Sequence, residues 1–231
     1  MPNAYDAILF DVGGPLDMEF AWEIAVDSAI AAACALEGIR VDEEALNVAS
    51  RRAVEVFAPD AYAHMVETLC GGDPQAVARV ERRVRDTLSG LDTFQLRPGI
   101  DGLLQRLLAQ GLALGIVANQ PATAVERLRR VGIVQHFRHL GLSALVGARK
   151  PDAASFIGAA EALGVEPARC IMVGDRIDND IAPAKALGMA AIRFRSGRHA
   201  RQQPRGPSEA PDADVVDVLE LERAIEALLG R

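Results

Sequence analysis

Several features that mark other classes of protein are missing from this chain of 231 residues. Its three cysteines, Cys34, Cys70 and Cys170, are scattered, with no CxxC pair and no metal-ligand spacing. We therefore expect buried thiols rather than a zinc site or a disulfide framework. No apolar run approaches the length of a membrane span, and the N-terminus lacks a basic, apolar leader. These absences predict a cytoplasmic protein with no membrane partner.

Lysine is nearly absent, and positive charge is in the minority. Lys150 and Lys185 are the only lysines among 25 basic residues, and 32 acidic residues bring the net charge to −7. General binding to nucleic acid needs a basic surface, so this balance argues against a nucleic-acid partner. The acid excess is local, because residues 17–95 contain 15 Asp or Glu and 7 Arg, whereas the remainder is nearly neutral.

Strand-like apolar runs alternate with helical patterns over most of the chain. The predicted strands cover residues 5–11, 112–118, 140–145, 170–174, 190–194 and 214–218. Helical spacing of apolar residues predicts helices over 100–110, 122–131, 153–163 and 179–187. This alternation predicts right-handed βαβ units, and hence an α/β fold whose Rossmann-like parallel sheet has helices on both faces.

One region lacks strand patterns. Residues 19–92 contain four predicted helices, over 20–36, 43–57, 61–69 and 75–88. We interpret this region as a small all-α domain inserted between the first and second core strands. Residues 1–18 and 93–231 then form the core domain. Within the core, residues 197–212 are rich in Pro, Arg and Gly and are predicted to be a long surface loop.

Four short motifs fall at or just after predicted strand ends. They are Asp11 followed by Gly13-Gly14, the pair Ala118-Asn119, the run Arg149–Asp152 around Lys150, and Gly174-Asp175 followed by Asp178, Asn179 and Asp180. Each motif alone would be an ordinary turn. Working residues of a parallel sheet lie beyond the carboxyl ends of its strands, so we expect the four motifs to meet at one edge.

In order and spacing these motifs resemble those of the haloacid dehalogenase superfamily of hydrolases, over about residues 5–194. The resemblance implies that Asp11 is a nucleophile that forms an aspartyl-phosphate, and that Lys150 pairs with Asp11 and the transferred phosphoryl group. It also implies that Asn119 contributes its N–H, and that Asp180 orients Lys150 or a metal-bound water.

The same resemblance implies a cofactor and a cap. Mg²⁺ would be held by Asp11, the carbonyl of Gly13 and Asp175, since Mg²⁺ prefers oxygen ligands. The helical insertion would be a cap domain that excludes water and selects the substrate. The partner would be a small phosphorylated molecule, bound by a monomer or a homodimer.

Two positions depart from the family pattern. Gly13 stands where phosphatases of the family have a second Asp, which protonates the leaving group. Ala118 stands where they have a Ser or Thr that binds a phosphate oxygen. We predict a Mg²⁺-dependent phosphatase (a phosphoric monoester hydrolase) that either acts on a good leaving group or takes its proton from Asp17, Glu19 or His64.

Two alternatives stay open at this point. The chain could be a 2-haloacid dehalogenase, since those enzymes also lack the second Asp and Arg40 falls about where their carboxylate-binding Arg lies. Against this, they generally have a Ser at the position of Asp175. The chain could also be a weakly active or inactive relative that binds a ligand or partner, although the clustered charges of Asp11, Lys150 and Asp175 would then cost stability without function.

Overall fold

The computed structural model describes residues 4–230, so residues 1–3 and 231 of the predicted core domain lie outside the described residues. Two compact units divide the chain. The first, here called the sheet unit, holds the chain up to Met18, Gln95–Ser196 and the chain from Gln203 onward. The second, the helical unit, holds Glu19–Phe94 together with Gly197–Gln202.

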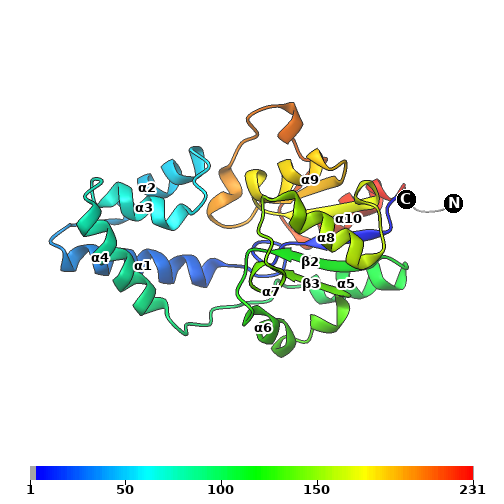
Figure 1. The fold of residues 1–231 in the computed structure, drawn as a ribbon, viewed down its shortest axis with the longest axis horizontal. Coiled ribbons are helices and arrows are strands. Elements are labelled where there is room, and N and C mark those ends of the chain that lie inside the picture. The colour runs from blue at the N-terminus through cyan, green and yellow to red at the C-terminus, as the bar shows by residue number, and fades with distance from the viewer. Residues whose placement is uncertain (1–3, 231) are drawn as a thin grey trace. The chain divides into compact units, whose positions relative to one another are not determined.

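In the described part of the chain, six parallel strands form the centre of the sheet unit (Figure 1). They are β1 (Ala7–Phe10), β2 (Ala113–Ala118), β3 (His139–Leu142), β4 (Cys170–Gly174), β5 (Ala190–Phe194) and β6 (Ala213–Val215). Every residue of β1, β2, β4 and β5 is buried, as strands covered on both faces require. The predicted α/β fold with a parallel sheet is confirmed.

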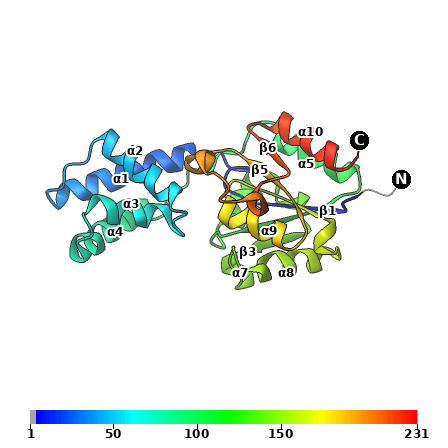
Figure 2. The ribbon, with the colours of Figure 1, turned by 90° about the horizontal axis from the view of Figure 1, so that it is seen from above.

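Helices cover both faces of this sheet, as Figure 2 shows. On one side lie α5 (Ile100–Ala109) and α10 (Val218–Leu228), and on the other lie α8 (Ala153–Leu163) and α9 (Ala182–Ala186). Successive residues of β1 serve opposite faces. Leu9 joins the apolar cluster that includes Phe156 of α8, whereas Phe10 meets the ring of Phe137 edge to face, with centroids 6.2 Å apart.

The strand order reverses between β1 and β4. Across the sheet the order is β3-β2-β1-β4-β5-β6, and Phe10 of β1 lies opposite Val173 of β4. In doubly wound sheets, ligands bind in the crevice beyond the carboxyl ends of the strands at such a reversal. This topology places Asp11 and Asp175, which directly follow β1 and β4, at the edge where a ligand site is expected.

Four helices make up most of the helical unit. They are α1 (Phe20–Leu36), α2 (Glu43–Glu55), α3 (Ala61–Leu69) and α4 (Pro74–Leu88). Their inward faces form one apolar cluster that includes Ile30, Met65 and Val80, all fully buried. No helix among residues 4–230 combines the length and the apolarity needed to cross a membrane.

Aspartates begin three of these four helices and account for part of the local acid excess. The side chains of Asp42, Asp60 and Asp73 accept backbone N–H bonds in the first turns of α2, α3 and α4. An N-cap of this kind stabilises a helix by about 1 kcal/mol. These three carboxylates therefore lie at the surface of the helical unit, where they remain solvated.

Two predicted strands end earlier than their apolar runs. The run over 140–145 leaves the sheet at Leu142, because Ser143–Val146 turns into the short helix α7. The run over 214–218 ends at Val215, because Asp217 caps α10 by accepting the N–H of Glu220 at 2.8 Å. Helix α6 (Ala124–Arg130) is also shorter than its predicted range.

The prediction of a surface loop over 197–212 is wrong for its first six residues. Arg198 packs into the helical unit, with 5 % of its side chain exposed. Its Nη2 donates to Asp27 Oδ1 at 2.8 Å, and its Nη1 donates to Ser50 Oγ at 2.6 Å. The guanidinium also lies 4.9 Å from the centroid of the Tyr62 ring. One arginine that follows β5 in sequence thus joins α1, α2 and α3.

Candidate active site

Three carboxylates converge beyond the carboxyl ends of β1 and β4. One oxygen from each of Asp11, Asp175 and Asp180 lies within 4.8 Å of the others. Asp175 is 4 % exposed and Asp180 is fully buried. Carboxylates this close disfavour one another's ionised form unless positive charge lies among them. We call these three residues the carboxylate cluster.

Lys150 supplies one positive charge to the carboxylate cluster. Its Nζ lies 2.9 Å from Asp11 Oδ1 and 2.6 Å from Asp180 Oδ1, and the residue is 3 % exposed. Burial by itself lowers the pKa of Lys150, but the two neighbouring carboxylates raise that pKa above its usual value. Lys150 is therefore an ammonium that pairs with two of the three carboxylates, and the oxygens of the cluster suit a divalent cation.

The backbone around Asp11 directs its carboxylate toward Lys150. The N–H of Asp11 donates to Val173 O at 2.8 Å, which extends the pairing of β1 and β4 past the end of β1. The N–H of Val12 donates to Asp11 Oδ1, also at 2.8 Å. Burial raises the pKa of Asp11 to about 6, against the lowering effect of Lys150. Near neutral pH this carboxyl group is mostly ionised, the form that a nucleophile or a metal ligand requires.

A single π-helical turn, Ile177–Ile181, brings Asp180 to Lys150. Such turns occur often at functional sites. Within it, the N–H groups of Asp180 and Ile181 both donate to Arg176 O, at 2.9 and 3.2 Å. In return the N–H of Arg176 donates to Asp180 Oδ2 at 3.0 Å. Gly174 makes the approach possible, because a Cβ there would lie 2.4 Å from Asp180 Cβ.

Asn119 and Asp178 have other partners. Asn119 holds the backbone of Lys150 in a reciprocal pair of hydrogen bonds, since its Nδ2 donates to Lys150 O and its Oδ1 accepts the Lys150 N–H, each at 2.9 Å. Asp178 pairs with the guanidinium of Arg176, Nη2 to Oδ2 at 2.5 Å, and is not part of the carboxylate cluster. Asn119 thus lies beside the predicted site and fixes the loop that carries Lys150.

Gly13 and Asp17 lie together in the turn that follows Asp11. Gly13 is buried, and its backbone forms an isolated parallel bridge with Asp17. The side chain of Asp17 accepts the N–H of Gln95 at 2.9 Å. This contact gives Asp17 a role in holding the turn to the returning chain, whether or not it also transfers a proton.

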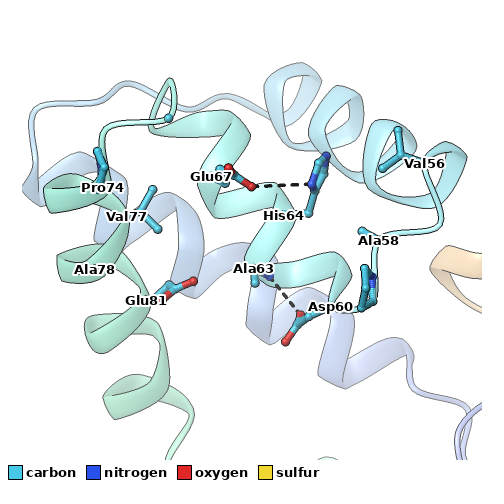
Figure 3. Close-up of a pocket in the computed structure, with 12 residues that line it drawn as sticks. Val56, Ala58, Asp60, Ala63, His64, Glu67, Pro74, Val77, Ala78 and Glu81 are labelled. Atoms are coloured by element: carbon cyan, nitrogen blue, oxygen red, sulfur yellow. Dashed lines mark hydrogen bonds and ion pairs between the residues drawn. The ribbon is translucent and has the colours of Figure 1, made fainter. Parts of the chain in front are cut away.

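His64 lies in the helical unit beside a hollow of about 600 Å³ (Figure 3). Ala63, His64 and Glu67 of α3 line one side of this hollow, and Pro74, Val77, Ala78 and Glu81 of α4 line the other. The Nδ1 of His64 is 3.9 Å from a carboxylate oxygen of Glu67. Of the candidate catalytic and metal-binding residues, only His64, a candidate proton source, is among those that line the hollow.

Sequence reasoning missed Arg97, which lies next to the turn after β1. Its Nε donates to Gly14 O at 2.7 Å, and its Nη2 donates to Ser196 Oγ at 2.7 Å. Its guanidinium carbon lies 4.4 Å from the centroid of the Phe194 ring. No motif marks this arginine, because its partners lie 83 and 99 residues away along the chain.

The sequence of this chain matches the model of one known protein family. The family model described as haloacid dehalogenase-like hydrolase matches residues 5–188, well over half of the chain. The chain is a haloacid dehalogenase-like hydrolase. The resemblance indicated by the four motifs is confirmed, and the matched residues include the carboxylate cluster and Lys150.

Several curated relatives of this haloacid dehalogenase-like hydrolase are named as phosphatases. A glyceraldehyde 3-phosphate phosphatase of Methanopyrus kandleri is 36 % identical over 119 residues, which is 51 % of this chain and 51 % of that protein. A phosphoserine phosphatase of Thermus thermophilus is 33 % identical over 129 residues, 55 % of this chain and 50 % of that protein. The chain thus spans about half the length of these relatives.

Similarity to solved structures extends over nearly the whole chain. A crystal structure of a predicted phosphoglycolate phosphatase from Haemophilus somnus aligns with a TM-score of 0.74 at 21 % identity. The alignment covers 97 % of this chain and 100 % of that one. At this identity the similarity establishes the fold, and it includes the helical unit as well as the sheet unit.

Proposed function

We propose that this hydrolase is a Mg²⁺-dependent phosphatase that acts on a small phosphorylated metabolite through Asp11. The observation that carries the proposal is the contact of Lys150 with Asp11 inside a cluster of three carboxylates at the reversal of the strand order. The phosphatase names of the relatives support the same reaction class. Asp175 also favours this reading over a haloacid dehalogenase, which generally has a Ser there.

The donor set fits Mg²⁺. Carboxylate and carbonyl oxygens are the ligands that Mg²⁺ prefers, and the carboxylate cluster brings one oxygen from each of three residues within 4.8 Å of the others. Asp11, Asp175 and the carbonyl of Gly13 would hold the ion, with Asp180 behind them against Lys150. When bound, Mg²⁺ would neutralise charge on the phosphoryl oxygens.

Asp11, Lys150 and Asn119 then have distinct roles in the reaction. A carboxylate oxygen of Asp11 attacks phosphorus, the bond from phosphorus to the leaving oxygen breaks, and an aspartyl-phosphate forms. Water next attacks that phosphorus, which releases inorganic phosphate and restores Asp11. Lys150 pairs with Asp11 and with the transferred group, and Asn119 keeps the backbone of Lys150 in place. Residues 19–92 would be the cap that limits access of water.

Gly13 limits which substrates can react quickly. Glycine has no side chain that can protonate a leaving group, and such help typically contributes about 10²–10⁴-fold to a rate. We therefore expect the enzyme to prefer acyl phosphates and sugar 1-phosphates, whose leaving groups need little protonation. Gly13→Asp should raise the rate on ordinary phosphate esters if the missing acid limits it.

The test is phosphate release from a panel of phosphorylated compounds that includes acetyl phosphate, sugar 1-phosphates, glyceraldehyde 3-phosphate and phosphoserine. Wild type, Asp11→Asn and Asp178→Asn are assayed with Mg²⁺ and with a chelator. Asp11→Asn should lower kcat by roughly 10⁴-fold or more, as loss of a nucleophile does in other enzymes. Asp178→Asn is the matched control, because Asp178 pairs with Arg176 outside the carboxylate cluster.

Two results would overturn the proposal. If Asp11→Asn retained the wild-type rate, another group would be the nucleophile or the observed activity would belong to a contaminant. If no compound on the panel released phosphate but 2-haloacids released halide, the chain would be a dehalogenase of the same family.

A further inference from the structure

We propose that Arg97 is a positioning residue that holds the turn at Gly13 and Gly14 against Asp175 and so sets the geometry of the Mg²⁺ site. The part of this inference that concerns Mg²⁺ rests on the proposed function. The part that concerns the turn stands on contacts within the sheet unit alone. We infer that Arg97 acts through Gly14, whose carbonyl oxygen accepts its Nε–H.

Gly14 lies directly against Asp175. Its φ is +79°, a conformation that favours glycine, and a Cβ added there would lie 2.8 Å from Asp175 Cβ and 3.3 Å from Asp175 Cγ. The turn and Asp175 are therefore in contact with no space between them. Any displacement of Gly14 moves the neighbouring carbonyl of Gly13 relative to the carboxylate of Asp175.

The peptide that joins Gly14 to Pro15 can be held by hydrogen bonding only through its carbonyl oxygen, because proline has no N–H. Arg97 donates to that oxygen from Nε at 2.7 Å. A hydrogen bond from an ionised donor is about twice as strong as one between neutral groups. Arg97 thus gives this peptide a strong contact from a side chain.

Arg97 is itself fixed on several sides. Its Nη2 donates to Ser196 Oγ at 2.7 Å, and its plane lies over the ring of Phe194, which is fully buried. Its backbone N–H donates to Leu16 O at 2.8 Å, so the main chain of Arg97 holds the far end of the same turn. A lysine ammonium cannot reproduce a planar fork that binds two oxygens and stacks on a ring.

The segments that Arg97 joins are those that lead into the helical unit. The turn with Gly14 precedes the exit after Met18, Arg97 follows the return at Gln95, and Ser196 is the last residue before the chain leaves again. Arg97 therefore holds three of the four connections between the units at their ends in the sheet unit.

The test compares Mg²⁺ binding by titration calorimetry in wild type, Arg97→Gln, Arg97→Lys and Ser196→Ala. Loss of a residue that orients metal ligands typically weakens metal binding by about 10–100-fold, and we expect this for Arg97→Gln. Arg97→Lys should recover only part of the loss, and Ser196→Ala should lose least. The KM for substrate should stay within about threefold, because Arg97 acts on the metal ligands rather than on substrate. Arg106→Gln, which removes an arginine paired with Glu222 at the surface, is the matched control.

A second readout does not depend on metal or on activity. In metal-free protein, the amides of Leu16 and Asp17 donate to Val12 O within the turn, and Arg97→Gln should make both exchange with solvent faster than in wild type. If exchange and Mg²⁺ affinity both match wild type, Arg97 does not position the turn. If exchange speeds up but wild type itself binds no Mg²⁺, the turn inference holds and the proposed function fails. If Arg97→Gln does not fold, amide exchange and Mg²⁺ affinity are compared between wild type, Arg97→Lys and Ser196→Ala instead.

Discussion

The sheet unit and the helical unit differ in whether they bury charged residues. Among residues 4–230, the charged residues that are buried as whole residues all belong to the sheet unit, namely Lys150, Asp175, Asp180 and Arg193. The helical unit encloses an apolar cluster, and three of its carboxylates lie exposed at helix starts, where they accept backbone N–H bonds. Its most enclosed guanidinium, Arg198, comes from the chain after β5 rather than from its own four helices.

This difference indicates that the sheet unit has buried charges suited to a chemical role, whereas the helical unit has an interior suited to stability. Burying like charges near one another costs folding free energy, and such an arrangement persists where the charges do something that apolar residues cannot. The sheet unit has that arrangement at the edge where its strand order reverses. The helical unit has the arrangement expected of a domain that only needs to be stable and to present a surface. Three substitutions test the comparison.

The largest effect is expected from Lys150→Ala. It leaves Asp11 and Asp180 buried without their shared ammonium, and removing one partner of a buried ion pair costs about 3–5 kcal/mol. Urea unfolding in the presence of a chelator measures the loss, and Mg²⁺ should restore part of it. Lys185→Ala is the control, because Lys185 pairs with Asp212 in a partly exposed position, where such pairs contribute about 0–1 kcal/mol. Both lysines lie in the sheet unit, so equal losses would mean that burial of the carboxylate cluster does not set the cost of losing its ammonium.

A smaller effect is expected from Arg198→Met. Methionine fills much of the same space but cannot donate to Asp27 and Ser50, and a hydrogen bond to a charged group contributes about 1.5–3 kcal/mol. Hydrogen exchange should speed up in α1 and α2 while the strands of the sheet unit keep their protection. Arg52→Met, at an exposed position of α2, serves as the control. Faster exchange in the strands instead would mean that Arg198 stabilises the sheet unit.

The smallest effect is expected from Arg106→Gln. Arg106 is 52 % exposed and pairs with Glu222 across α5 and α10, and exposed pairs contribute about 0–1 kcal/mol. The midpoint of urea unfolding should shift little, and Mg²⁺ binding should not change. A loss comparable with that of Lys150→Ala would show that surface pairs, rather than the buried cluster, dominate the electrostatics of the sheet unit.

The fold could be predicted from the sequence because the spacing of apolar residues is a local signal and the rules for connecting parallel strands are strict. The predicted helices over 20–36, 61–69 and 153–163 match α1, α3 and α8 residue for residue. Four polar motifs fall at or just after the ends of predicted strands, and this placement predicts one ligand-binding edge of the sheet. Asp11 and Asp175 do lie together at that edge. The chemical roles assigned to these residues stay predictions until the variants are assayed.

What could not be predicted depends on contacts between distant segments. Asp178 and Asp180 stand two residues apart, so spacing alone does not distinguish them. The family resemblance favours Asp180, and the π-helical turn does bring Asp180 to Lys150. Arg97 and Arg198 each join segments that are 83 to 171 residues apart, and neither belongs to a motif. No periodicity in the sequence could have identified these two arginines.

The position of Gly197–Gln202 also bears on how enzymes of this kind can be recombined. The helical unit is a discontinuous module, assembled from a long piece inserted after β1 and a short piece supplied after β5. A transplant of residues 19–94 into a relative would leave Arg198 behind, and Asp27 and Ser50 would lose its guanidinium. An exchange of the helical unit between relatives would therefore have to move both pieces of the module together.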